Sequence, residues 1–247
     1  MSDTPDGAFA KRRSIRSFII REGRLTRGQA RALDSGWPLY GIEYSAEPTD
    51  LRAAFKDTAH HPLTLEIGFG NGEALFEMAK RNTDQNFVGI EVHRPGVGHL
   101  LMLLQEAALQ NARVINHDAM DVLEHMVADH TFNRINLYFP DPWPKKKHHK
   151  RRIVQPSFLA LLHRRLAPGG RLHFATDWHP YAEHMCAVLQ SSALFRNTRD
   201  NATAAHDATP DDVCVPRPDS RPLTKFEKRG HRKGHGVWDF IFERVDN

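Results

Sequence analysis

The sequence predicts an α/β fold built on a mostly parallel β-sheet with helices on both faces. Two observations predict it. From residue 63 onward, short apolar runs alternate with segments of helical periodicity, and the first apolar run ends in a glycine-rich turn at residues 68–72. Because parallel strands need a crossover connection, usually a helix, this alternation is typical of such a sheet.

Short apolar runs mark the expected strands. In chain order they span residues 63–67, 86–91, 112–116, 134–139, 171–175 and 237–244, with a weaker run at 194–198. The expected helices span residues 73–81, 96–110, 120–127, 155–166 and 180–190. The fourth helix stops at Ala167-Pro168-Gly169-Gly170, because proline cannot continue a helix and glycine accepts unusual backbone angles.

Two parts of the chain lack this alternation. We expect residues 1–60 to form a basic N-terminal extension, disordered over residues 1–10, and residues 61–247 to form the α/β domain. Residues 199–236 have little periodicity and many Pro, Asp, Arg and Gly residues. A loop of that length in a compact domain is usually functional or disordered.

The composition excludes several classes of protein. Of 247 residues, 40% are hydrophobic and 26% charged, and no run approaches the roughly 18 apolar residues that a membrane-spanning helix needs. The N-terminus lacks the apolar core of a secretory signal. Cys186 and Cys214 are too few for a disulfide scaffold or a Cys-based zinc site, and the 16 histidines have no metal-ligand spacing. We therefore expect a cytoplasmic protein without membrane or metal.

The net charge of +4 conceals a segregation of charge. Residues 1–31 carry eight Lys/Arg against three acids, residues 145–152 six against none, and residues 217–233 seven against two. The rest of the chain is therefore strongly acidic. Separated basic segments around an acidic body favour a polyanionic partner, although each segment alone also suits a solvated loop.

The glycine-rich turn follows an acid, Glu66, at the end of the first strand. Glycines there let the backbone turn sharply and approach a ligand. A dinucleotide fingerprint would need glycine where Glu73 stands, and a phosphate-binding P-loop would need a lysine after Gly72. Neither pattern is present, and the negative charge of Glu66 disfavours a pyrophosphate.

A cationic ligand suits this turn better. S-adenosylmethionine carries a sulfonium and an ammonium group, which Glu66 can complement. Glu91 ends the second strand, where an acid can accept hydrogen bonds from both ribose hydroxyls, and Asp118 follows the third strand, where it can accept from an adenine amino group. Each acid alone also suits a strand end, and Asp118 a helix cap. Three acids at successive strand ends favour the S-adenosylmethionine site.

The fourth strand leads into Pro140-Asp141-Pro142-Trp143 and then into the basic run at residues 145–152. The two prolines restrict the backbone on either side of Asp141, Trp143 offers a face for base stacking, and the basic run can bind phosphates. The prolines also suit a simple strand end, and Trp143 a core position. A rigid acid, an aromatic ring and cations together favour a polynucleotide site.

Several segments together resemble one family. The glycine turn at residues 66–72, Phe139-Pro140-Asp141-Pro142-Trp143, Ala175-Thr176-Asp177-Trp178 and the segment 224–230 closely resemble the bacterial tRNA (guanine-N7-)-methyltransferase (TrmB) family. The N-terminal segments 16–18 and 24–29 are similar to that family too. The resemblance covers residues 16–244, and the Pro-Asp-Pro-Trp and Thr-Lys-Phe-Glu elements are its most specific parts.

The resemblance implies a fold and a reaction. The fold is that of class I S-adenosylmethionine-dependent methyltransferases, a Rossmann-like seven-stranded sheet whose last strand is antiparallel. The reaction transfers a methyl group to N7 of a guanine in the tRNA variable loop and forms 7-methylguanosine. The implied partner is tRNA, and the protein is either a monomer or a homodimer.

The family's site residues carry over by type. The implied cofactor contacts are Glu66, Gly68, Gly70, Glu91, Asp118 and Asp141, and Asp141 is also the implied catalytic residue. The implied substrate contacts are Lys145, Asp177, Thr224, Lys225, Phe226 and Glu227. The implied RNA-binding residues are Lys147, Lys150, Arg151 and Arg152.

Other interpretations stay open on the residues alone. Asp177 suits a helix N-cap, and residues 224–227 suit a surface turn. A methyltransferase for ribosomal RNA or protein would carry the same glycine turn, and a non-catalytic RNA-binding protein could keep the fold. The intact acids and the unbroken Pro-Asp-Pro-Trp favour an active enzyme, and the glycine spacing disfavours a dehydrogenase.

Overall fold

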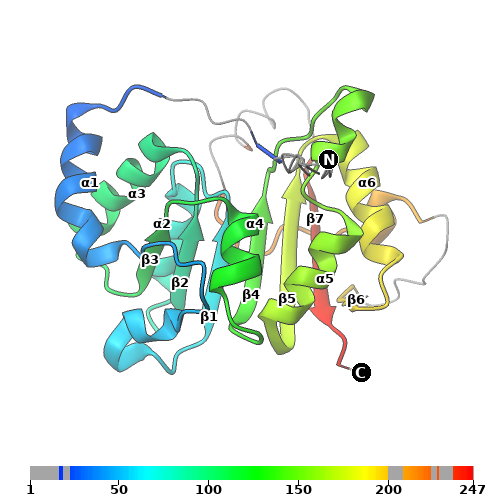
Figure 1. Ribbon diagram of the computed structural model, residues 1–247. Helices are drawn as coiled ribbons and strands as arrows, with labels where there is room; N and C mark the ends of the chain where they lie inside the picture. The colour runs from blue at the N-terminus through cyan, green and yellow to red at the C-terminus, as the bar shows by residue number, and fades with distance from the viewer. Residues whose placement is uncertain (1–16, 19–22, 200–207, 224–226, 228–235, 247) are drawn as a thin grey trace, which may run out of the picture.

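The fold is a seven-stranded sheet with helices on both faces, as a computed structural model of residues 17–18, 23–199, 208–223, 227 and 236–246 describes it (Figure 1). The strand order is β3-β2-β1-β4-β5-β7-β6. Strand β7 runs antiparallel to both neighbours, and the other neighbouring pairs are parallel. The expected α/β class and the antiparallel last strand are confirmed.

The strands match the apolar runs closely. They are β1 (Leu63–Ile67), β2 (Asn86–Ile90), β3 (Ala112–Ile115), β4 (Phe132–Tyr138), β5 (Leu166–Thr176), β6 (Phe195–Asn197) and β7 (Trp238–Arg244). Every residue of β1, β2 and β3 is buried. Because helices cover both faces of a parallel sheet, its inner strands are buried on both sides and are nearly continuous apolar runs.

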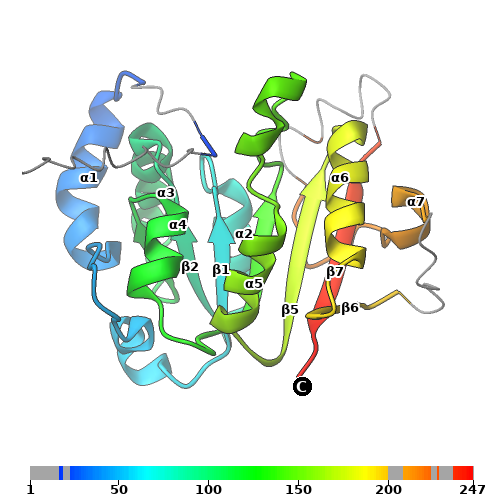
Figure 2. The same ribbon diagram turned by 45° about the vertical axis from the view of Figure 1, so that its right-hand side comes forward.

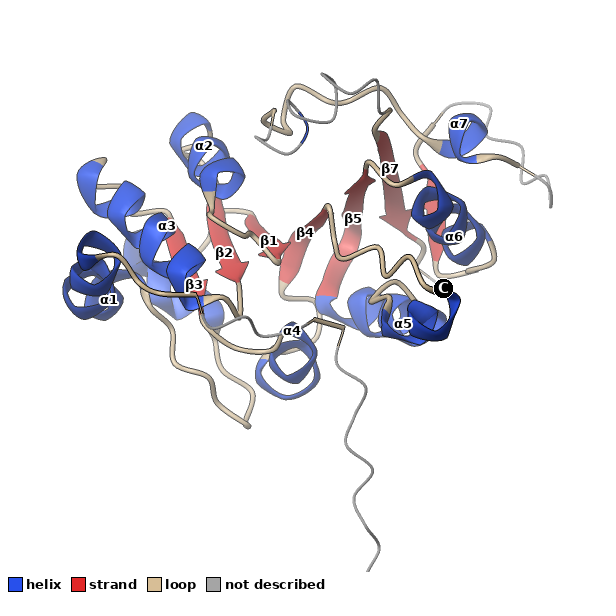
Figure 3. Cartoon of the chain, turned by 90° about the horizontal axis from the view of Figure 1, so that it is seen from above, coloured by secondary structure: helices blue, strands red, loops and turns tan. Residues whose placement is uncertain are grey.

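Two helical layers enclose the sheet (Figures 2 and 3). One holds α1 (Arg27–Tyr40), α2 (Glu73–Arg81) and α3 (Arg94–Glu106); the other holds α4 (Ala119–Asp121) with a π-helical turn (Val122–Met126), α5 (Pro156–Arg165) and α6 (His179–Gln190). Adjacent residues of β2 face opposite layers: Phe87 packs in the first core and Val88 in the second. The remaining helices are two 3-10 helices (Leu51–Thr58 and Lys146–Arg151) and α7 (Pro210–Val213).

Strand β5 begins five residues earlier than expected. It starts at Leu166, which pairs with Phe132, and regular pairing resumes at Arg171 with Arg134. The register shifts in between, where Gly169 takes a φ of +68°. The Pro-Gly-Gly segment therefore ends α5 as expected and also forms an irregular first part of the strand. The expected helix at 120–127 is likewise irregular, because it changes from an α-helical to a π-helical turn.

Part of the expected N-terminal extension packs against the α/β domain. Helix α1 lies on α3, where the Tyr40 hydroxyl, in a residue only 3% exposed, donates to the Leu104 carbonyl at 3.1 Å. The following chain adds Leu51 and Phe55 to the second core. Residues 1–10, expected to be disordered, lie outside the described residues. Helix α1 was not predicted, although Thr26 and Gln29 form the reciprocal capping box that marks a helix start.

Membrane-spanning and metal-binding features are both absent from the described ranges. Within them, no helix is long and apolar enough to cross a membrane. In the same part of the chain, no three His, Cys, Asp or Glu side chains are grouped so that they could hold a metal ion. Cys186 and Cys214 are free thiols.

A substitution in the capping box tests whether α1 unfolds together with the sheet. Thr26→Ala removes the hydroxyl that accepts from the Gln29 N–H, and we expect the free energy of unfolding to fall by about 1 kcal/mol in urea denaturation. Ser35→Ala, in the same helix but away from its start, is the control and should change it less. An unchanged global transition in Thr26→Ala would show that α1 is an independent appendage.

Candidate active site

A cavity of about 690 Å³ opens at the carboxyl ends of β1 to β4. Its walls come from the turn after β1, from residues 91–93 after β2, from residues 117–119 after β3 and from residues 139–144 after β4. Ser17 and Phe18 complete it from the N-terminal part of the chain. Parallel strands bring their carboxyl ends to one edge, which is where α/β sheets bind ligands.

The glycine turn needs glycine for its backbone angles. Gly68 and Gly70 have φ values of +70° and +60°, and a Cβ at either would meet no atom within 4 Å. Their requirement is therefore conformational rather than steric. Gly96 in α3 is different, because a Cβ there would lie 2.0 Å from the Gly70 carbonyl oxygen. Helix α3 thus packs directly against the turn.

The Glu91 carboxylate holds the turn in place. One oxygen accepts from the Gly70 N–H at 2.8 Å, and the other accepts from the N–H groups of Val92 and His93 at 2.7 and 2.9 Å. The Glu91 carbonyl accepts from the Asn116 side chain at 2.7 Å, which joins the end of β3. Glu91 lines the cavity, as expected for a ligand contact, and also connects three strand ends.

Glu66 is a buried acid with an unused acceptor. It is 3% exposed and immediately precedes Ile67 and Gly68, which line the cavity. Its Oε2 has no hydrogen-bond partner among the described residues. Burial, and then the charge of Glu91, raise the pKa of the Glu66 carboxyl to about 8. An unpaired buried polar atom calls for a donor, and a ligand in the cavity can supply one.

Asp118 combines a helix cap with a position at the cavity. It caps α4 by accepting from the Met120 N–H at 3.0 Å, and it lines the cavity. Next to it, the His117 ring stacks on Tyr44 with the centroids 3.8 Å apart and the planes 6° from parallel. His117 also lines the cavity, and it was not predicted because a lone histidine carries no spacing signal.

Asp141 stands on a strained turn. The residues that flank Pro140-Asp141-Pro142, Phe139 and Trp143, take φ values of +52° and +44°, which are rare for side chains of their size. Such angles persist where the surroundings hold them and cluster at functional sites. Asp141 is exposed and lines the cavity.

Trp143 is engaged by other parts of the chain. Its indole Nε1 donates to the Ser17 carbonyl at 2.9 Å, and the Arg151 guanidinium lies 5.0 Å from the ring centroid. The His148 ring lies in a T-shaped arrangement with the indole, with the ring centroids 5.7 Å apart. The ring thereby connects the N-terminal segment, the Asp141 turn and the basic run, rather than lying free as a stacking surface.

The basic residues divide into two groups. Lys145, Lys147 and Lys150 are exposed, and Arg151 is half-buried over Trp143. Arg152, expected to bind RNA, is instead only 4% exposed, and its guanidinium donates to the carbonyls of Pro142 and Pro180 at 3.0 and 3.3 Å. Its side chain is turned inward because these carbonyls accept its N–H groups, and it braces the Asp141 turn.

The remaining expected substrate contacts are placed in part. Asp177 follows β5 at the same edge of the sheet and is half-buried. Glu227 is 1% exposed and is held by Arg221, a residue that was not predicted from the sequence. Thr224, Lys225 and Phe226 lie outside the described residues.

Comparisons with known proteins decide the family. The model of a family described as "putative methyltransferase" matches residues 60–240. A tRNA (guanine-N(7)-)-methyltransferase of Aeromonas hydrophila is 54% identical over 241 residues, 98% of this chain and 96% of that protein. The chain belongs to the tRNA (guanine-N(7)-)-methyltransferase family. A second member, from Cronobacter sakazakii, is 55% identical and covers 94% of this chain and 92% of its own length.

The fold of this methyltransferase is shared more widely. The crystal structure of the 16S rRNA methyltransferase KamB superposes with a TM-score of 0.52 at 14% identity, covering 81% of this chain and 95% of that one. The class I fold, the enzyme class and the family resemblance are therefore confirmed. S-adenosylmethionine is the methyl donor. The lining acids Glu91, Asp118 and Asp141 suit its cationic groups, and the Oε2 of Glu66, next to the lining residue Ile67, is an acceptor without a partner among the described residues.

The raised pKa of Glu66 predicts a pH-dependent stability. The folded protein keeps a proton that the unfolded chain releases above its ordinary pKa of 4.5, so this contribution is full below that value and is lost as the pH rises to about 8. We expect Glu66→Gln to lack this decline, measured by urea denaturation between pH 5 and 9. Glu77→Gln, at an exposed acid of α2, is the control. A wild-type-to-Glu66→Gln difference that is constant with pH would contradict the assignment.

Proposed function

We propose that the edge cavity is the active site in which this methyltransferase transfers the methyl group of S-adenosylmethionine to N7 of a guanine in tRNA, forming 7-methylguanosine. The observation that carries the proposal is that the acids following β2, β3 and β4, which are Glu91, Asp118 and Asp141, all line one cavity beside the glycine turn after β1. The resemblance to the family adds the variable loop as the position of the guanine. We also propose a cytoplasmic location, which a tRNA substrate supports.

Each proposed cofactor contact binds a different part of S-adenosylmethionine. Gly68 and Gly70 let the backbone approach the ligand, and Glu66 accepts from its ammonium group. Glu91 accepts from the ribose hydroxyls and Asp118 from the adenine amino group. S-adenosylmethionine supplies an electrophilic methyl group on a sulfonium. Asp141, the exposed acid on the far wall, faces the place where donor and base must meet.

The reaction needs no proton transfer by the protein. Guanine N7 carries an in-plane lone pair and no proton, so no general base is needed, and the methylated ring becomes cationic. Catalysis therefore depends on in-line placement and on negative charge near the developing cation. Asp141 accepts from the guanine N1–H or amino group and offsets the new charge. Asp177 and Glu227, with Lys145 and residues 224–226, position the base and ribose.

The RNA is held by cations beside the cavity. Lys147 and Lys150 are exposed and Arg151 is half-buried over Trp143, and all three follow the Asp141 turn. Their position beside the cavity supports contacts with phosphates on either side of the target guanine. Arg152 supports them indirectly, because it fixes the turn from inside. The charge segregation of the sequence is consistent with a tRNA that also contacts the basic N-terminal and C-terminal segments.

Methyl transfer to a matched pair of transcripts tests the reaction. The enzyme receives methyl-labelled S-adenosylmethionine and either an unmodified tRNA transcript or the same transcript made with 7-deazaguanosine, which has carbon in place of N7. We expect label in 7-methylguanosine from the first and none from the second. Label in another nucleoside, or equal labelling of both transcripts, would overturn the proposed function.

Asp141→Asn tests the catalytic acid. The amide keeps the size of the side chain but removes the charge that offsets the cationic ring, so kcat should fall by about 100-fold or more. S-adenosylmethionine binding, followed by calorimetry, should be largely kept. Asp129→Asn, at an acid outside the cavity, serves as the control. Near-normal turnover in Asp141→Asn would remove Asp141 from the mechanism.

The proposed phosphate contacts predict a change in salt dependence. Alanine at Lys147, Lys150 or Arg151 should weaken tRNA binding and reduce the slope of log K against log salt by about one unit for each phosphate that is no longer neutralised. Filter binding between low and physiological salt measures the slope. Arg81→Ala is the control, because Arg81 ends α2 near the amino ends of the strands, and it should leave the slope unchanged. A slope unaffected by all three substitutions would place the RNA elsewhere.

A further inference from the structure

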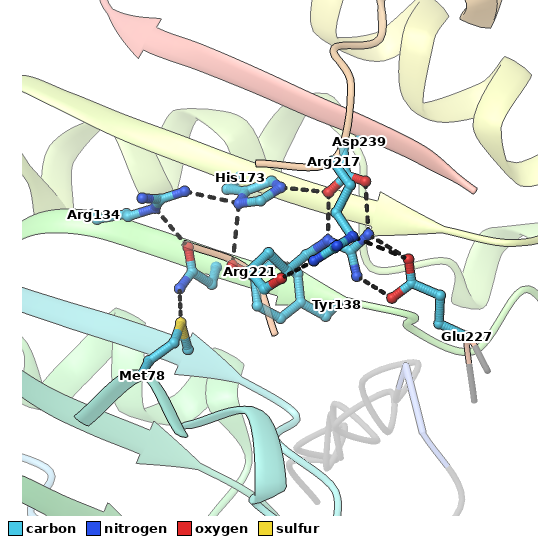
Figure 4. A network of polar contacts seen from close by, with 9 residues as sticks. Met78, Arg134, Tyr138, His173, Arg217, Arg221, Glu227 and Asp239 are labelled. Atoms are coloured by element: carbon cyan, nitrogen blue, oxygen red, sulfur yellow. Dashed lines mark hydrogen bonds and ion pairs between the residues drawn. The ribbon is translucent and has the colours of Figure 1, made fainter. Parts of the chain in front are cut away.

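Arg221 is a fully buried cation that holds two acids at once. It is 0% exposed, and its guanidinium donates to both oxygens of Glu227 at 2.6 and 2.9 Å and to both oxygens of Asp239 at 2.6 and 2.8 Å (Figure 4). Asp239 belongs to β7, and Glu227 belongs to the segment expected to contact the substrate. One side chain thus ties Glu227 to the sheet.

The same guanidinium contacts the end of β4. Its central carbon lies 5.9 Å from the ring centroid of Tyr138 and 5.6 Å from that of Phe139. Tyr138 is the last residue of β4, and Phe139 is the left-handed residue that opens the Asp141 turn. Both line the cavity. Arg221 therefore lies between the two segments that carry Asp141 and Glu227.

The network behind Arg221 keeps Asp239 charged. His173 accepts at Nδ1 from the Tyr138 hydroxyl at 3.1 Å and from Arg134 at 2.8 Å, and donates from Nε2 to Asp239 at 2.6 Å. Burial lowers the pKa of His173 to about 4, so the ring is neutral. Although burial opposes its charge, hydrogen bonds from His173 and Arg221 lower the pKa of Asp239, which remains a carboxylate.

Only an arginine can make this set of contacts. Its N–H donors form a planar fork that two carboxylates meet from different directions, each carboxylate through both of its oxygens. A lysine carries one ammonium and cannot bond bidentately to both. Arg217 donates to the Arg221 carbonyl at 2.8 Å, and its Nε lies 4.0 Å from a Glu227 carboxylate oxygen, which places a second cation beside Glu227.

We infer that Arg221 is a positioning residue of the active site: it joins the buried acids Glu227 and Asp239 to Tyr138 and Phe139, and so holds the turn that carries Asp141 in place for the guanine. The inference rests on the proposed function. Arg221 acts through Glu227 and the Tyr138–Phe139 step and touches none of the expected cofactor contacts directly. Its loss should therefore reduce turnover on tRNA while leaving the affinity for S-adenosylmethionine unchanged.

Arg221→Lys is the principal test, and Arg165→Lys is its matched control. Arg165 is also buried, pairs with Asp129 and donates to the Leu123 carbonyl, but lies at the opposite edge of the sheet. For each variant, kcat and KM on tRNA, S-adenosylmethionine affinity and thermal unfolding are measured. We expect kcat to fall by about 100-fold in Arg221→Lys, as misplacement of a reacting group does, and to stay within about threefold of wild type in Arg165→Lys.

Two further variants separate positioning from folding. If Arg221 acts through Glu227, the double variant Arg221→Lys/Glu227→Gln should be no slower than Glu227→Gln alone. Asp239→Asn keeps the shape of the network but weakens its hold on Arg221, so it should lower kcat without loss of S-adenosylmethionine binding, even if Arg221→Lys fails to fold.

The outcomes distinguish this inference from the proposed function. Wild-type enzyme that forms no 7-methylguanosine would refute the proposed function itself. If the wild type is active and Arg221→Lys is as fast as Arg165→Lys, the positioning role is overturned. If Arg221→Lys does not fold, a wild-type kcat in Asp239→Asn overturns it instead. Additive losses in the double variant would likewise contradict action through Glu227.

Discussion

The hydrogen bonds from three backbone N–H groups to the Glu91 carboxylate are the constraint on which the site depends. A turn that contains glycines in the left-handed region has many accessible conformations, and each must be lost for a ligand to bind tightly. Glu91 removes that freedom because its carboxylate bonds the Gly70 N–H to the end of β2. Gly96 packs closely on the Gly70 carbonyl and leaves the turn no room to shift toward α3. The part of the cavity that we propose for the cofactor is thereby held by contacts within the chain itself.

The substrate side is held differently, by buried cations. Arg152 fixes the Asp141 turn through the Pro142 carbonyl, and Arg221 fixes Glu227 through paired charges. Desolvating these guanidinium groups costs free energy, which their hydrogen bonds offset only while every partner is present. The strained angles of Phe139 and Trp143 are kept in the same way. Rigid placement of acids is what a reaction without proton transfer requires, because orientation and charge are then the main sources of rate.

The strands and the acids at their ends could be predicted from the sequence, because a local pattern of residues determines both. Strands buried on both faces are nearly continuous apolar runs, and acids such as Glu66 and Glu91 lie at or just after their carboxyl ends, so this edge of the sheet could be inferred from the order of residues alone. Helix α1 was missed because Gly36 and Pro38 interrupt its pattern, although its capping box was readable. The inward orientation of Arg152 and Arg221 could not be predicted, because a charged residue in a basic segment gives no sign that distant carbonyls or acids will meet it.

A crystal structure with S-adenosylhomocysteine would test the assembled site most directly. We predict the product nucleoside in the edge cavity, its ribose hydroxyls on the Glu91 carboxylate, its adenine amino group near Asp118 and its ammonium group on the Oε2 of Glu66 that lacks a partner among the described residues. Ligand bound outside this cavity, or bound within it while Glu66 stays unpaired and Glu91 contacts no ribose, would contradict the assignment of these acids to one cofactor site.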